Sequence, residues 1–138
     1  MIFFILLDTN VILDFAMKRG EHYAFARKIM EEIAEGRLIG HVSASQITDI
    51  YYFLEKEFSR EKAVKVIVDL IGSIRVIRVD KETIETAIES GMSDFEDAVQ
   101  AASAHAVYVD IVVTRDKKGF LDSDLRVYSP EEFLKALE

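Results

Sequence analysis

The chain has 138 residues, of which 50% are hydrophobic and 30% are charged, and its formal net charge is −8. This length and composition are typical of one globular domain with a buried core, so we expect residues 1–138 to form a single domain. The negative charge argues against a broad basic surface for nucleic acid, although bound cations can neutralise a local cluster of carboxylates.

Cysteine is absent, which excludes disulfide and thiolate chemistry and fits a reducing compartment. The first residues lack the basic start and the small-residue cleavage site of a signal peptide. No stretch approaches the ~20 consecutive apolar residues that a membrane span needs. We therefore expect a cytoplasmic protein without a membrane segment.

Strands and helices alternate along the whole chain. The predicted strands are residues 2–7, 38–42, 75–79, 110–114 and 126–128. The predicted helices begin near Val11 and then cover residues 22–35, 46–57, 60–72, 81–90, about 94–108 and 130 onward. This alternation favours an α/β fold of three layers, α/β/α, with a parallel sheet between two helical layers. The most apolar strands, 2–7 and 110–114, belong in the centre of that sheet.

Two helices have a predicted inner face. In the helix over 60–72, the spacing of apolar residues places Leu70 and Ile71 toward the core. In the helix after Gly91, the run Ser93-Asp94-Phe95-Glu96 reads as a capping box, and Phe95 is expected on the core side.

Two aspartates follow the two most apolar strands. Asp8 ends strand 2–7, and Asp116 lies two residues after strand 110–114. If these strands are neighbours, their carboxyl ends meet at the edge where open α/β sheets bind ligands. Because adjacent parallel strands are ~4.8 Å apart, the two carboxylates could share one small cation.

Further acids come from the helices beside this edge. Asp94 and Asp97 are three residues apart and so share one face of the helix that leads into the fourth strand. That helix begins at the edge where the strands finish, so it carries both acids toward Asp8 and Asp116. Asp49 lies early on the helix after the second strand, where it interrupts an apolar and aromatic run.

Each acid also has an ordinary structural interpretation. Asp8 could cap the helix that follows it, Asp116 could be a turn residue, and Asp49 could occupy a solvated helix position. Asp94 and Asp97 could complement the helix dipole. The convergence of several acids on one edge favours a site, because independent accidents rarely coincide.

The chemistry of these acids points to a metal ion. Carboxylates without a cysteine or a histidine among them suit hard cations such as Mg²⁺ or Mn²⁺. His105, on the same helix as Asp97, lies more than two turns away and cannot share its ion. Hard divalent cations hold phosphate oxygens and activate water for in-line displacement, so the pattern favours metal-assisted phosphodiester chemistry.

Three segments resemble the signature of PIN-domain nucleases, and in particular their VapC-like prokaryotic members. They are Leu7-Asp8-Thr9-Asn10, Asp94-Phe95-Glu96-Asp97-Ala98 and Val113-Thr114-Arg115-Asp116. The resemblance spans essentially the whole chain and implies a five-stranded parallel sheet with an acidic metal pocket. It also implies a ribonuclease that uses Mg²⁺ or Mn²⁺, acts as the toxin of a toxin–antitoxin pair and forms a homodimer. Its partners would be an RNA substrate and an antitoxin protein.

Position by position, the resemblance makes Asp8, Asp97 and Asp116 the catalytic and metal-binding acids. Asp94 is an additional acid that would tune the pocket or bind a second ion. The family usually has a glutamate where this chain has Asp49, which is about one methylene shorter and would act catalytically through water. The polar residues that match the neighbours of the acids, and would orient them, are Thr9, Asn10 and Thr114.

Two surface features have a functional and an ordinary interpretation. Basic residues after the acid-bearing strand ends could hold RNA phosphates or form a simple solvated surface. These residues are Lys18, Arg19, Arg115, Lys117 and Lys118. The consecutive aromatics Tyr51, Tyr52 and Phe53 make their helix apolar on more than one side, which favours a buried dimer contact.

Two other functions fit the sequence less well. A phosphotransfer domain of the haloacid-dehalogenase type would need a second aspartate where Asn10 stands, and a receiver-type domain would need one at another central strand end. A non-catalytic PIN-like domain that binds RNA or a partner protein is the second alternative, which the departure at Asp49 keeps open.

Overall fold

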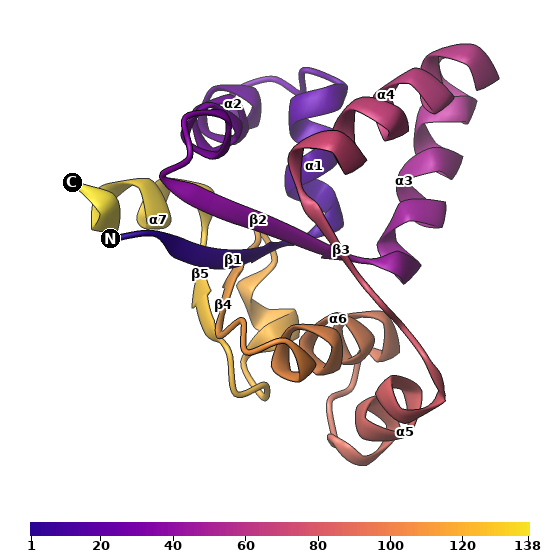
Figure 1. The fold of residues 1–138 in the computed structure, drawn as a ribbon, viewed down its shortest axis with the longest axis vertical. Coiled ribbons are helices and arrows are strands. Elements are labelled where there is room, and N and C mark those ends of the chain that lie inside the picture. Colours follow the sequence, from indigo (N-terminus) through magenta and orange to yellow (C-terminus); the bar gives the residue numbers. More distant parts are fainter.

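The computed structural model describes residues 1–138 and contains one sheet of five strands (Figure 1). The strands are β1 Phe3–Leu7, β2 Leu38–Ser43, β3 Arg75–Ile77, β4 Ile111–Val113 and β5 Arg126–Tyr128. Their order is β3-β2-β1-β4-β5, and every neighbouring pair is parallel. This arrangement confirms the predicted α/β fold with a parallel five-stranded sheet.

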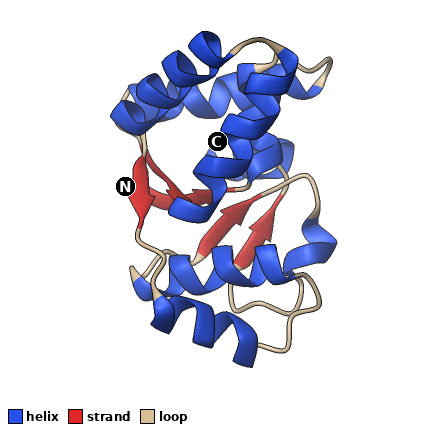
Figure 2. Cartoon of the chain, turned by 90° about the vertical axis from the view of Figure 1, so that its right-hand side faces the viewer, coloured by secondary structure: helices blue, strands red, loops and turns tan.

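Helices cover both faces of the sheet (Figures 1 and 2). One face carries α1 Thr9–Ala16, α2 His22–Ala34, α3 Ala44–Glu57, α4 Arg60–Ser73 and α7 Pro130–Leu137. The other carries α5 Lys81–Glu89 and α6 Phe95–Ala106, and a short 3-10 turn, η1 Lys117–Phe120, follows β4. None of the helices is both long and apolar enough to cross a membrane.

The side chains of β1 alternate between the two hydrophobic cores. Ile5 and Leu7 pack beneath the larger helical layer, whereas Leu6 faces α6 and packs with Val112 and Phe120. All five of these side chains are completely buried. A strand enclosed on both faces needs an uninterrupted apolar sequence, which is why the N-terminal residues have one.

The two central strands end together. Leu6 and Leu7 of β1 align with Val112 and Val113 of β4, and the backbone N–H of Asp8 donates to the Val113 carbonyl at 3.0 Å. The predicted neighbours are therefore neighbours, and β3 and β5 are the edge strands, as their polar sequences indicate. The topology brings the residues after β1 and β4 to one edge.

Three local predictions are wrong. Ile71 and Phe95 are each about half exposed rather than turned to the core. Ile71 lies beside the narrow stripe of Ala63 and Leu70 that α4 buries, and Phe95 is the first residue of α6, before that helix reaches its neighbours. The N-cap of α6 is Asp94 rather than Ser93, because the Asp94 carboxylate accepts from the Asp97 backbone N–H at 3.0 Å.

Gly40 of β2 tests the packing beneath the larger helical layer. A Cβ at this position would lie 2.8 Å from Ile33 Cδ1 and 3.0 Å from Ile74 Cγ2, so both would have to move. We expect Gly40→Ala to lower the free energy of unfolding by about 1–3 kcal/mol, measured by urea denaturation. Gly72→Ala in α4 is the control, because nothing lies within 4 Å of its Cβ and alanine should raise stability by up to about 1 kcal/mol. Equal effects of the two substitutions would contradict this packing.

Candidate active site

The carboxylate of Asp8 lies at the carboxyl end of β1 and is only 6% exposed. Its Oδ1 accepts from the backbone N–H of Thr9 at 2.7 Å, which makes Asp8 the N-cap of α1. Its Oδ2 accepts from Asn10 Nδ2 at 3.1 Å and from the Thr114 hydroxyl at 2.6 Å. The three polar residues expected beside this acid therefore all contact it, although Thr9 does so through its backbone.

A fourth donor to Asp8 is one that the sequence reasoning missed. Gln100 of α6 is buried and donates from Nε2 to Asp8 Oδ1 at 3.1 Å, while its own Oε1 is buried without a hydrogen-bond partner. Gln100 lies three residues after Asp97 and so shares its helix face, a spacing that could have identified it. Four donors from three parts of the chain fix the orientation of this carboxylate.

A second glutamine connects α3 to the end of β1. Gln46 accepts at Oε1 from the Ser43 backbone N–H at 2.7 Å, which completes a capping box. Its Nε2 donates to the Leu7 carbonyl at 2.8 Å and to Thr9 Oγ1 at 3.3 Å. The sequence signal for this role was glutamine three residues after a capping serine.

The other predicted metal-binding acids lie around Asp97. Burial and the nearby carboxylates of Asp8, Asp94 and Asp116 raise the pKa of Asp97 from its ordinary value of 3.8 to about 7. Gly119 of η1 allows this approach, because a Cβ there would clash with Asp97 Oδ2 and lie 3.3 Å from Asp116 Oδ2. We call the four residues Asp8, Asp94, Asp97 and Asp116 the acidic cluster.

The chemistry of the acidic cluster fits a hard divalent cation. Its donors are carboxylate oxygens, which Mg²⁺ and Mn²⁺ prefer, and a cation would relieve the repulsion that raises the pKa of Asp97. No three acidic or histidine side chains form a ready-made metal site. Asp8, Asp97 and Asp116 are the side chains that could hold the ion, with Asp94 at the start of α6 as an additional acid.

Asp49 lies apart from these interactions. It is partly buried on α3, one turn after Gln46, and its side chain makes no hydrogen bond or ion pair. It is also not among the carboxylates that raise the pKa of Asp97. The catalytic role assigned to Asp49 stays a prediction.

A partly buried ion pair holds the segment that carries Asp116. Arg115 donates from Nε to Asp14 Oδ2 at 2.6 Å and from Nη2 to Asp14 Oδ1 at 3.1 Å, and Asp14 is only 1% exposed. Arg19 lies 3.8 Å from the same carboxylate, and the Arg115 backbone N–H donates to Asn10 Oδ1 at 3.4 Å. Helix α1 thereby fixes the chain between β4 and η1.

The proposed phosphate contacts differ in their surroundings. The guanidinium of Arg115 is bound to Asp14, and Lys117 pairs with Glu132 of α7 at 3.0 Å on an exposed surface where such pairs are weak. Lys118 is exposed and forms no ion pair. Contact of these residues with RNA stays a prediction.

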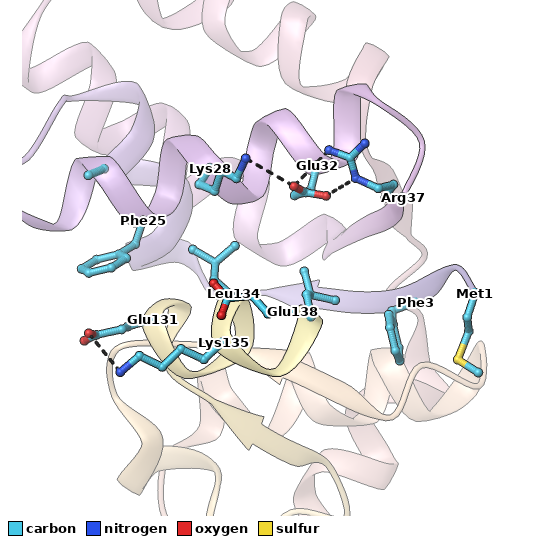
Figure 3. A pocket seen from close by; sticks show the side chains of 12 residues that line it. Met1, Phe3, Phe25, Lys28, Glu32, Arg37, Glu131, Leu134, Lys135 and Glu138 are labelled. Atoms are coloured by element: carbon cyan, nitrogen blue, oxygen red, sulfur yellow. Dashed lines mark hydrogen bonds and ion pairs between the residues drawn. The ribbon is translucent and has the colours of Figure 1, made fainter.

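A cavity of about 710 Å³ lies at the opposite end of β1 from Asp8, between α2 and α7 (Figure 3). Most of its charged side chains neutralise one another, since Glu32 pairs with Lys28 and Arg37 and Glu131 pairs with Lys135. It brings together none of the predicted site residues.

A comparison with known sequences identifies a family. The family model for the PIN domain matches residues 4–118, a segment that contains the whole acidic cluster. Ribonuclease VapC1 of Aquifex aeolicus (strain VF5) is 26% identical to this chain over 134 residues, which cover 94% of this chain and 92% of that protein.

Solved structures share the fold. VapBC2 from Rickettsia felis, bound to a DNA fragment from its promoter, gives a TM-score of 0.72 at 15% identity and covers 91% of this chain and 98% of that one. VapC20 of Mycobacterium tuberculosis, a sarcin-ricin loop cleaving toxin, gives 0.62 at 16% identity and covers 78% of this chain and 86% of that one. At these identities the likeness establishes a common fold.

The raised pKa of Asp97 predicts that stability depends on pH in metal-free buffer. Between its unfolded pKa of 3.8 and its folded pKa of about 7, Asp97 is protonated in the folded state and ionised in the unfolded state. Its contribution to the free energy of unfolding is therefore fully present below pH 4 and is lost as pH rises through 7. We expect Asp97→Asn to raise the free energy of unfolding at pH 8 by about 1–2 kcal/mol, less than the full shift because the residue is partly exposed. Urea denaturation in EDTA at pH 5 and pH 8 tests this, and an equal gain at both would contradict it.

The ion pair beneath the Asp116 segment predicts a large loss of stability when its acid is removed. We expect Asp14→Ala to lower the free energy of unfolding by about 1.5–3 kcal/mol, because it removes the charge-assisted hydrogen bonds to the partly exposed Arg115 guanidinium. Asp110→Ala is the matched control, since its pair with Arg126 is exposed at 3.7 Å and should contribute less than about 1 kcal/mol. Similar losses in the two variants would show that Asp14 does not hold this segment.

Proposed function

Because this chain belongs to the PIN-domain family, we propose that it is a divalent-metal-dependent ribonuclease that hydrolyses phosphodiester bonds. The observation that carries the proposal is the acidic cluster at the carboxyl ends of β1 and β4. Burial and the nearby carboxylates of Asp8, Asp94 and Asp116 together raise the pKa of Asp97 to about 7. Such a concentration of negative charge is unfavourable without a cation, and a cation is what phosphodiester hydrolysis needs.

In this proposal Asp8, Asp97 and Asp116 hold Mg²⁺ or Mn²⁺, and Asp94 is an additional ligand. The bound ion would neutralise charge on the phosphate and supply an activated water. The chain itself fixes the ligands: the hydroxyl of Thr114 and the amide of Gln100 orient Asp8. Asp49, on the neighbouring helix α3, would assist through a water molecule.

Thr114 also links two of the acids. Its hydroxyl donates to Asp8 Oδ2 at 2.6 Å and accepts from the Asp116 backbone N–H at 2.9 Å. One buried hydroxyl therefore sets the position of Asp116 relative to Asp8. A ligand set held in this way needs little rearrangement to act, which is what a metal-dependent hydrolase requires.

We further infer that the protein is the toxin of a toxin–antitoxin pair that acts in the cytoplasm as a homodimer. The likeness to ribonuclease VapC1 and to the solved VapBC2 assembly supports this inference. Tyr52 and Phe53 of α3 support it as well, because both are exposed and pack edge to face at 5.6 Å, which leaves an apolar surface for a second copy or an antitoxin.

A non-catalytic PIN-like domain that binds RNA or a partner protein is the second candidate. The specific observation in its favour is Asp49, which forms no hydrogen bond or ion pair with the acidic cluster and stands where the family resemblance implies a glutamate. Binding of RNA without metal binding or cleavage would favour this candidate. A phosphotransfer domain has less support, since Asn10 occupies the place of its second aspartate and donates to Asp8 at 3.1 Å.

The first test is cleavage of a mixed RNA panel in Mg²⁺, Mn²⁺ or EDTA. We expect Asp8→Asn to lower metal-dependent cleavage by at least about 100-fold, the upper end of what loss of a residue beside a metal costs. Asparagine can still cap α1 but has one accepting oxygen instead of two, so we expect a folded but less stable variant, and circular dichroism checks that it is folded. Asp69→Asn, on the exposed surface of α4, should cleave at the wild-type rate. Unchanged cleavage by purified Asp8→Asn would refute the mechanism, and wild-type cleavage in EDTA would refute its metal dependence.

A further inference from the structure

A second concave site lies on the α6 face of the sheet. It is a groove of about 340 Å³ whose walls come from β1, β2, β3 and the turn after α6, and include Phe4, Arg75, Arg78 and Tyr108. We call it the basic groove. It lies at the end of α6 opposite the acidic cluster, and Phe4 is four residues, about 13 Å, before Asp8 on β1.

The basic groove is positively charged although the chain carries a net charge of −8. No acidic residue lines it, whereas four other cavities, of about 250 to 710 Å³, each have at least one acid in their walls. Two acids are nearest in sequence. Asp80 is the N-cap of α5 and accepts from the Thr83 backbone N–H at 3.0 Å, and Asp110 pairs with Arg126 at 3.7 Å. The groove is therefore a local site for anions.

The two arginines of the groove are without partners. Neither Arg75 nor Arg78 forms an ion pair or a side-chain hydrogen bond, although Arg78 lowers the pKa of Asp80 after the larger effect of the Thr83 hydrogen bonds. Arginines that do pair with acids are Arg19, Arg27, Arg37, Arg115 and Arg126. Two unpaired guanidinium groups on one groove suit phosphate oxygens, which arginine binds in a bidentate manner.

Aromatic surface accompanies these charges. Tyr108 is 94% exposed and has a φ of +62°, a backbone conformation that residues other than glycine rarely adopt. Phe4 is 44% exposed and lies 6.2 Å from the ring of His41. His41 Nδ1 donates to the Ile5 carbonyl at 3.2 Å, and burial lowers the pKa of His41, so its ring is a neutral part of the wall.

These features together match one class of ligand. Unstacked bases of single-stranded RNA pack on aromatic side chains, while their phosphates pair with arginine. We propose that the basic groove binds a single-stranded segment of RNA, with a base against Tyr108 and Phe4 and with phosphates on Arg75 and Arg78. This proposal rests on the proposed ribonuclease function, because the same RNA would continue to the acidic cluster.

The geometry sets the length of RNA that can use both sites. Phe4, Leu6 and Asp8 alternate along β1 and so lie on the same side of the sheet, the side that Leu6 shares with α6. Leu6 between these two residues is buried against α6, so RNA that reaches both sites passes around that helix. It therefore spans more than the roughly four stacked nucleotides that about 13 Å would hold at 3.4 Å each. The basic groove would therefore strengthen binding of longer RNA and leave shorter RNA unaffected.

The test measures RNA binding separately from cleavage. A fluorescein-labelled single-stranded RNA of about 12 nucleotides, within the span of known single-strand sites, is titrated by anisotropy with Asp97→Asn protein in EDTA. Tyr108→Gly keeps the left-handed backbone and removes the ring, and we expect roughly tenfold weaker binding. Tyr108→Phe keeps the ring and should bind as tightly as the parent.

The arginines have their own test and control. Arg75→Ala with Arg78→Ala should weaken binding and lower the slope of log affinity against log salt by about 1.4, the contribution of two phosphate contacts to a single strand. Arg60→Ala on α4 is the matched control, because Arg60 is also exposed and unpaired but lies outside the groove. Circular dichroism verifies that each variant is folded.

Each outcome decides the proposal. Unchanged affinity in folded groove variants, or an equal loss in Arg60→Ala, would overturn it. So would groove variants that lose binding of an acidic peptide while retaining RNA, because that result assigns the groove to a protein partner. If the wild type cleaves RNA in the presence of metal and the groove variants bind RNA normally, the groove proposal is rejected and the proposed ribonuclease function stands. If the groove variants bind RNA more weakly and the wild type does not cleave RNA, the groove proposal is supported and the proposed ribonuclease function is rejected.

Discussion

The hydrogen bonds to Asp8 are the interaction on which the candidate site depends. This carboxylate caps α1, accepts the hydroxyl of Thr114 after β4 and accepts the amide of Gln100 from α6. Hydrogen bonds to a charged group contribute about 1.5–3 kcal/mol each, so the carboxylate stabilises the junction of three segments as well as offering oxygens to a ligand. Asp8 can therefore cap α1 and also bind a metal ion, because the two roles are compatible.

The remaining acids place an electrostatic cost on this junction. Asp97 is partly buried and lies near Asp8, Asp94 and Asp116, and burial together with these carboxylates raises its pKa, so a further negative charge there is unfavourable. The surrounding contacts offset that cost without touching the carboxylates. Arg115 fixes the segment of Asp116 through Asp14, and Gln46 fixes the end of β1 through the Leu7 carbonyl. These contacts outside the acidic cluster stabilise the segments that carry its carboxylates. Such compensation is expected where charges are placed close together in order to bind a ligand.

The sequence predicted what depends on local pattern and on topology. The apolar runs before Asp8 and Asp116 identified the central strands, and parallel topology then brought both acids to one edge. It did not predict Gln100 or the Arg115–Asp14 pair, because their partners lie 92 and 101 residues away and no period relates them. The burial of Phe95 was predicted wrongly because helical periodicity does not show at which residue a helix begins to pack against neighbouring elements. Asp49 lies on the predicted helix, and its catalytic role stays a prediction, because its carboxylate is not among the groups that raise the pKa of Asp97.

The opposite charges of the acidic cluster and of the basic groove can act independently on one RNA strand. Arg75 lies two strands away from β1, about 10 Å at ~4.8 Å per strand. The Debye length at physiological ionic strength is about 8 Å, so this arginine is largely screened from the acidic cluster. The negative charge of the whole chain would repel RNA over longer distances, but that repulsion is screened as well. A groove without acids can thus attract phosphates on an acidic protein, while the acidic cluster itself binds no phosphate until a cation neutralises it. In this arrangement the basic groove binds the RNA strand and the acidic cluster cleaves it.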